Sequence, residues 1–248
     1  MAQIRTVKGT CVPVKYLVLG MLQNNVYLIS DGSATIVVDP SCKADDILAA
    51  AGGSVDAIVL THRHSDHVGA AKELRDKTGA TVIASAVDAP IISDEKKLPR
   101  DDMRFAPCPV DHVVNDGDIL KIGNMPWKVI LTPGHTEGSM CLFIDPQFGT
   151  DIAAAPVLVS GDTLFCGSIG RTDFQGGDMN AMEVPGSGWT VFSGILLVLC
   201  SLWILFQPLV FGTTAVVIWV GISLLFAGIA ACSLSIQLRQ AHRCLGNR

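Results

Sequence analysis

The sequence predicts an α/β domain with two sheet-forming halves, followed by a two-helix transmembrane hairpin. Short β-type runs alternate with helical stretches in the first part of the chain, which is the rhythm of α/β domains. A second set of short strand-like runs follows. From Val184 to Leu238 the chain has no Asp, Glu, Lys or Arg. Charged residues make up 17% of the whole chain, so the deficit is concentrated in this last part.

Strands and helices alternate in the first half of the globular part. The helical stretches 43–51 and 69–78 lie between apolar runs that are typical of strands, at 26–29, 35–38, 57–60 and 81–84. The second half has strand-like runs separated by turn residues, at 119–122, 127–131, 140–144 and 157–159. We therefore expect two sheets within residues 1–180.

Two apolar runs, 184–206 and 209–238, are each long enough to cross a bilayer, which needs about 20 residues. Gln207 and Pro208 interrupt them, and proline marks a tight hairpin because it does not continue a helix interior. We expect a junction at 181–188, two transmembrane helices within 189–238 and a basic tail at 239–248.

The basic tail predicts where the chain lies in the cell. Positive charge favours the cytoplasmic side, and both ends of a two-span hairpin lie on the same side. We therefore expect a multi-pass membrane protein whose catalytic domain and C-terminus are cytoplasmic. The formal net charge of −5 argues against a nucleic-acid partner.

The strongest chemical signal is the segment from Thr61 to His67, directly after an apolar run. In an extended loop the side chains of His62 and His64 point to the same side, so both can bind one ion. Asp66 and His67 in the following turn can face a second ion. Imidazole and carboxylate ligands suit zinc, and also iron or manganese.

Two further candidate ligands follow later strand-like runs. His135 stands in a Thr-Pro-Gly-His segment, and Asp162 ends a Ser-Gly-Asp segment. Strand ends that face one edge of the sheets would bring both residues to the early histidine cluster.

These residues resemble the pattern of the metallo-β-lactamase superfamily. The His-x-His-x-Asp-His loop, the later His and the later Asp of that family are matched by His62, His64, Asp66, His67, His135 and Asp162. The segments 132–139 and 167–174 are similar to the glyoxalase II, or hydroxyacylglutathione hydrolase, branch, and the resemblance covers about residues 12–178.

The resemblance implies an αββα sandwich with the metal centre at one edge. His62, His64 and His135 would hold the first ion, Asp66 and His67 the second, and Asp162 would bridge them. Asp66 is also our candidate catalytic residue. Such a centre activates a water molecule that attacks a thioester or ester of a small-molecule substrate.

Arg171 and Asp173 belong to a loop that the resemblance places beside the site. Two interpretations remain open for them. A buried ion pair between the two side chains would hold the loop, or the side chains would contact the substrate.

The chain departs from the family pattern after this loop. The family continues with a helix, a strand and a Gly-His-Gly turn whose His completes the second metal site. We expect neither His112, as a surface residue, nor His242, in the tail, to replace it. The sandwich is therefore predicted to be incomplete, with one firmly bound zinc, an incomplete second site and an uncovered sheet edge that favours self-association.

The apolar part resembles the last helix pair of the HdeD family of small membrane proteins, through Gly188–Gly194, Gln207-Pro208-Leu209 and 221–229, closed by Arg239. Three functions stay open. The first is a zinc-dependent, glyoxalase II-like hydrolase. The second is a mononuclear iron oxygenase similar to persulfide dioxygenases, with His62, His135 and Asp162 on iron. The third is a non-catalytic product of gene fusion.

Overall fold

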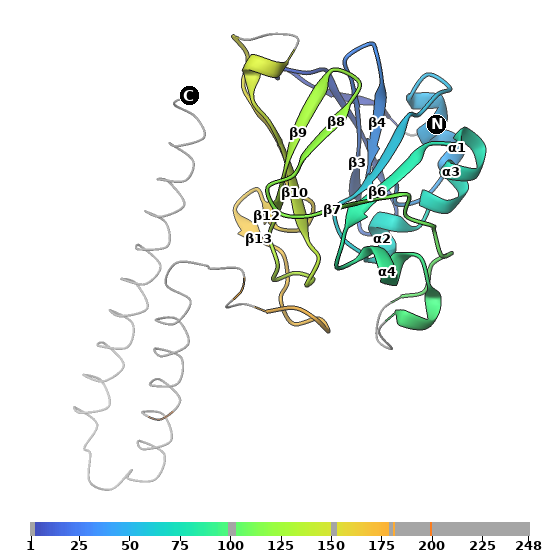
Figure 1. Cartoon of the computed structure of the whole chain (residues 1–248), viewed down its shortest axis with the longest axis vertical. Helices are drawn as coiled ribbons and strands as arrows, with labels where there is room; N and C mark the ends of the chain where they lie inside the picture. Colours follow the sequence, from blue (N-terminus) through green and yellow to red (C-terminus); the bar gives the residue numbers. More distant parts are fainter. Residues whose placement is uncertain (1–2, 99–102, 150–152, 179–180, 182–198, 200–248) are drawn as a thin grey trace, which may run out of the picture. The chain divides into compact units, whose positions relative to one another are not determined.

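The computed structural model describes residues 3–98, 103–149, 153–178, 181 and 199 (Figure 1). The chain divides into two units, Met1–Met182 and Glu183–Arg248, and every element named below lies in the first. This part has the mixed α/β architecture expected from the alternating strand and helix patterns.

Two sheets form the centre of this unit (Figure 1). The strands of the first sheet, in spatial order, are β1 (Arg5–Val7), β2 (Val14–Leu19), β3 (Asn24–Ser30), β4 (Thr35–Val38), β5 (Ala57–Leu60), β6 (Thr81–Ser85) and β7 (His112–Val114). The second sheet contains, in spatial order, β11 (Val157–Val159), β10 (Met140–Ile144), β9 (Met125–Leu131) and β8 (Ile119–Ile122). A short hairpin joins β12 (Leu164–Phe165) and β13 (Ser168–Ile169).

The direction of the strands changes within the first sheet. Strands β1 to β4 pair antiparallel, whereas β4, β5, β6 and β7 run parallel to one another. The parallel strands need crossover connections, and the helices α1 (Ala44–Ala50) and α3 (Ala71–Thr78) provide two of them. As a consequence, the carboxyl ends of β4, β5 and β6 meet at one edge of the sheet.

Two apolar cores hold the layers together. The first lies between the sheets, where Val38 and Val59 of the first sheet pack in one cluster with Trp127 and Leu142 of the second. The other core joins the outer face of the first sheet to α1, α3 and the short helices α2 (Ser65–Val68) and α4 (Ala89–Ile92). The described residues therefore form three layers, helices on sheet on sheet, and the fourth layer of the expected αββα sandwich is not among them.

The membrane prediction is wrong on the described residues. In this part of the chain no helix combines the length and apolar character needed to cross a membrane. This finding contradicts the expected multi-pass location, with a cytoplasmic catalytic domain and tail, and we do not retain it. The two expected spans, the HdeD-like segment and the tail lie outside the described residues, except for Leu199.

Trp127 provides a test of the core between the sheets. Its side chain is fully buried in β9, and truncation to alanine removes its contacts with both sheets. We expect Trp127→Ala to lower the free energy of unfolding by about 3–5 kcal/mol in urea titrations. Met21→Ala, at a side chain that is 93% exposed, should change it by less than about 0.5 kcal/mol. Equal effects of the two substitutions would contradict this description of the core.

Candidate metal centre

The histidine cluster lies where β5 ends. All four residues of β5 are buried, and Thr61 and His62 follow directly at the edge of the sheet. The extended backbone of His64 leads into the short helix α2, which carries Asp66 and His67. His67 returns to the cluster, because its ring centroid lies 4.2 Å from that of His62.

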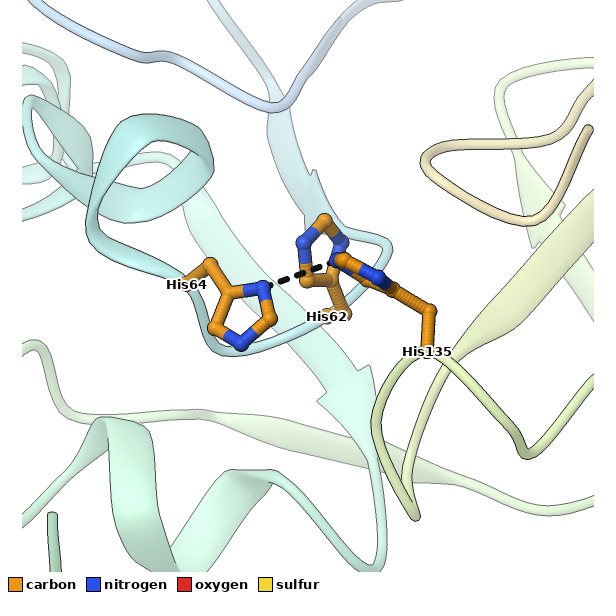
Figure 2. A group of neighbouring side chains, drawn as sticks. All are labelled: His62, His64 and His135. Carbon is orange, nitrogen blue, oxygen red and sulfur yellow. Dashed lines mark hydrogen bonds between the residues drawn. The ribbon is translucent and has the colours of Figure 1, made fainter. Parts of the chain in front are cut away.

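His62, His64 and His135 come together from two different sheets (Figure 2). One nitrogen of each imidazole lies within 4.8 Å of the others. The nearest pair, Nδ1 of His64 and Nε2 of His135, is 2.9 Å apart. His135 reaches this point because it follows β9, whose carboxyl end faces the same edge as that of β5. The expected group of three imidazoles is therefore present.

Asp162 lies between this group and His67. Its Oδ2 is 3.4 Å from Nε2 of His135, and its Oδ1 is 3.2 Å from Nε2 of His67. Burial raises the pKa of Asp162, but the hydrogen bond and charge of His67 outweigh this and the net pKa is lowered. The carboxylate is thus held ionised between the two groups, where the sequence predicts a bridging ligand.

Asp39 belongs to the site and was missed by the sequence analysis. Its Oδ2 lies 2.9 Å from Nδ1 of His67, and its carboxylate also accepts hydrogen bonds from the amide and hydroxyl of Thr61 at 2.8 and 2.6 Å. Asp39, His62 and His67 form a second compact group of potential ligands. The available signal was the position of Asp39 directly after β4, the parallel neighbour of β5.

Hydrogen bonds orient two of the imidazoles. Nδ1 of His135 lies 2.7 Å from the carbonyl oxygen of Arg171, which can only accept, so the ring donates there and Nε2 keeps its lone pair. Nδ1 of His62 lies 3.1 Å from the Thr61 hydroxyl, which donates its own hydrogen to Asp39. Such contacts are typical of histidines that bind metal ions, because they fix the ring and the tautomer.

The donor set fits a metal ion. Nε2 of His62 is buried and has no hydrogen-bond partner among the described residues. A buried polar atom without a partner costs about 1–3 kcal/mol. Metal bonds of about 2.0–2.2 Å place neighbouring ligand atoms about 2.8–3.6 Å apart, and the contacts of His135 with His64 and Asp162 fall within this range.

The histidines differ in their affinity for protons. Burial, followed by repulsion from neighbouring histidines, lowers the pKa of His62 well below its usual value and that of His64 to about 4. Burial lowers the pKa of His67 as well, but Asp39 and Asp162 outweigh this and raise it to about 10. Without a metal ion, His62 and His64 are therefore neutral at pH 7, whereas His67 is protonated.

Arg171 and Asp173 do not form a buried pair. Their side chains are 68% and 67% exposed and bind each other at 2.9 Å. Their loop contributes differently, because the Arg171 carbonyl fixes His135 and Phe174 packs against the rings of His64 and His135 at centroid distances of 5.2 and 5.9 Å. No sequence signal marked Phe174 as a wall of the site.

A buried ion pair supports the ligand loops from behind. The side chains of Arg63 and Asp88 are each 1% exposed and meet at 3.0 Å. Asp88 also accepts hydrogen bonds from the Arg63 amide at 3.0 Å and the Thr136 hydroxyl at 2.9 Å. Arg63 donates further to the carbonyl of Gln175. One pair thus connects the loops that carry His64, His135 and Phe174.

The six predicted site residues therefore lie together, with Asp66 half-exposed at the side of His67, 3.6 Å from its Nε2. His112 is exposed on β7, as expected for a surface histidine. His242 lies outside the described residues.

The family model of the metallo-beta-lactamase superfamily matches residues 19–198. The chain belongs to this superfamily. The match extends beyond residue 178, where the sequence analysis ended the resemblance, so the predicted truncation is not supported. The HdeD-like segment and the predicted self-association also lack support.

Related sequences include proteins named as hydrolases. The chain is 31% identical to "Hydroxyacylglutathione hydrolase GloC" from Haemophilus influenzae, over 64% of this chain and 76% of that protein. It is 37% identical to a hydroxyacylglutathione hydrolase from Acidiphilium cryptum, over 63% of this chain and 55% of that protein. The chain thus spans about half the length of the second relative.

Solved structures share the fold. The B3 metallo-beta-lactamase BLEG-1 is 29% identical with a TM-score of 0.57, covering 73% of this chain and 81% of that one. TTHA1623, crystallised in a di-iron-bound form, is 31% identical with a TM-score of 0.55, covering 68% and 81%. The superfamily binds metal ions, and its relatives leave the choice between zinc and iron open for this chain.

Substitution of Asp88 tests the buried pair. Asp88→Ala leaves the Arg63 charge buried without its carboxylate, so we expect a loss of about 3–5 kcal/mol in the free energy of unfolding, measured in urea. The surface pair of Arg75 and Asp111 provides the control, since Asp111→Ala should cost clearly less. A loss for Asp88→Ala no greater than that of the control would show that the buried pair does not stabilise the loops.

The pH dependence of the metal-free protein follows from the histidines. Between pH 6.5 and about 4 the unfolded chain protonates His62 and His64 while the folded chain does not, so stability falls as the pH falls. Between pH 6.5 and about 10 the folded chain keeps a proton on His67 that the unfolded chain loses, so stability falls as the pH rises. Thermal unfolding of chelator-treated protein should show a maximum near pH 6.5. A steady rise in stability from pH 4 to 10 would contradict this assignment.

Proposed function

We propose that this protein is a metal-dependent hydrolase of small-molecule thioesters or esters, similar to glyoxalase II. One observation carries the proposal: His62, His64 and His135 converge with Asp162 at one sheet edge, and the buried Nε2 of His62 has no hydrogen-bond partner in the described part of the chain. Membership of a superfamily that includes hydrolases supports it.

We assign the ligands in two groups. His62, His64 and His135 would hold the first ion, Asp66 and His67 the second, and Asp162 would lie between them. A metal ion bound there lowers the pKa of a water ligand and polarises the carbonyl group of the substrate. Three imidazoles favour zinc at the first position, while iron and manganese remain alternatives.

The chain's own residues would then orient the reactants. Asp66 is our candidate catalytic residue, because its carboxylate is 29% exposed and can accept a proton from water at the open side of the site. Phe174 covers the outer edges of His64 and His135 and would keep solvent from that side.

Nucleophilic side chains near the site are poorly placed to replace water. Burial raises the pKa of Cys141, so its thiol stays protonated at neutral pH. Ser139 is buried and bound to Thr136. Both facts favour attack by water over a covalent intermediate on the protein.

The names of the related hydrolases suggest a hydroxyacylglutathione thioester as the substrate. S-Lactoylglutathione is therefore the first compound to test. Since the chain spans only part of some of these relatives, thioesters and esters without the glutathione group belong in the same assay.

Removal of one ligand tests the proposal. His135→Ala should lower kcat/KM for S-lactoylglutathione hydrolysis by more than about a hundredfold, which exceeds the effect of losing a group that only supports a ligand. It should also lower the zinc bound per chain after dialysis. His112→Ala, at an exposed histidine on β7, should leave both quantities unchanged.

Three results would count against this function. The first is metal-loaded protein that hydrolyses no thioester or ester above background. The second is activity that survives complete removal of metal. The third is oxygen uptake with a persulfide in iron-loaded protein, which would favour the oxygenase alternative instead.

A further inference from the structure

Asn24 is the first residue of β3 and lies against the proposed second metal site. Its Nδ2 is 2.8 Å from Oδ2 of Asp66 and 2.9 Å from Nε2 of His67. Both of these residues are assigned above as ligands of the second ion. Of the six candidate ligands predicted from the sequence, only Asp66, His67 and Asp162 are assigned to this ion in the described part of the chain.

The distances around Asn24 match those of a coordination shell. Neighbouring ligand atoms of one ion lie about 2.8–3.6 Å apart when the metal bonds are about 2.0–2.2 Å long. The Asn24 carboxamide stands at 2.8 and 2.9 Å from Asp66 and His67. The contacts of His67 with Asp162 and Asp66, at 3.2 and 3.6 Å, complete the same set.

The carboxamide oxygen of Asn24 is available for a cation. Oδ1 is buried and has no hydrogen-bond partner among the described residues. When Asp66 directs its lone pairs to a cation, Nδ2 loses this acceptor and faces a positive charge. A half-turn of the amide exchanges its two atoms and presents Oδ1 to the cation instead.

We propose that Asn24 supplies its amide oxygen as a fourth protein ligand to the second metal site. This inference rests on the proposed metal centre and adds a residue to it. The completed site would contain two carboxylates, one amide oxygen and one imidazole, whereas the first site has three imidazoles. Oxygen-rich sites suit harder cations, so the second site should accept Mn²⁺ more readily than the first.

The test counts the second ion directly. The full chain is loaded with one equivalent of Zn²⁺ and titrated with Mn²⁺, and free Mn²⁺ is measured from its electron paramagnetic resonance signal. We expect the wild-type protein to bind one Mn²⁺ per chain, and Asn24→Leu to weaken this binding at least about tenfold.

Asn24→Asp separates a metal ligand from a hydrogen-bond donor. An aspartate keeps an oxygen ligand and adds charge, so Mn²⁺ should bind more tightly if Asn24 is a ligand. If Asn24 only donates a hydrogen bond to Asp66, the aspartate removes the donor and repels that carboxylate, and binding should weaken. Asn25→Asp is the matched control, because it adds the same charge at the exposed neighbouring position.

A greater gain in affinity for Asn24→Asp than for Asn25→Asp, together with the loss in Asn24→Leu, would support the proposal. Weaker binding in Asn24→Asp, unchanged binding in Asn24→Leu, or a wild-type protein without a second ion would overturn it. None of these outcomes depends on catalysis. Hydrolysis could fail while two ions bind, which would overturn the proposed function alone.

Discussion

The structure depends on the burial of imidazole and carboxylate groups at one edge of two sheets. His62, His67 and His135 are each at most 5% exposed, and burying polar groups without partners opposes folding. Some are satisfied by protein atoms, as His67 is by Asp39. Others, such as Nε2 of His62, have no partner in the described part of the chain. A cation would satisfy these atoms, so metal binding and folding should stabilise each other.

Two carboxylates, which follow the parallel strands on either side of β5, support the ligand loop after β5. On one side, Asp39 after β4 binds the Thr61 amide and orients His67. On the other side, Asp88 after β6 binds the Arg63 amide and reaches Thr136 near His135. The loop is thus held at the backbone amides of Thr61 and Arg63, one on each side of His62. This arrangement follows from the parallel order β4, β5 and β6, which places three carboxyl ends at one edge.

The two proposed metal positions differ in their chemistry. Three imidazoles surround the first, whereas the second is dominated by the oxygens of Asp66, Asp162 and Asn24. Asp162 lies between them and can neutralise charge at both. The loop from Arg171 to Phe174 closes one side of the first position through a carbonyl and an aromatic ring. The relatives named as hydroxyacylglutathione hydrolases suggest the substrate class. A substrate would have to bring its reacting carbonyl group to the sheet edge that carries the candidate ligands.

The sequence by itself determined the features that depend on neighbours along the chain. Buried runs such as 57–60 predicted strands, and the histidine pattern from His62 to His67 predicted a metal loop. The strand-end argument also located His135 and Asp162. Only the tertiary structure identified Asp39, Asn24, Asp88 and Phe174, because their contacts join residues far apart in the chain. Asp39 contacts His67 28 positions away, and Asp88 contacts Thr136 48 positions away. A single polar residue after a strand looks like any turn residue. Hydropathy alone misled the membrane prediction, since an apolar run does not by itself specify what buries it.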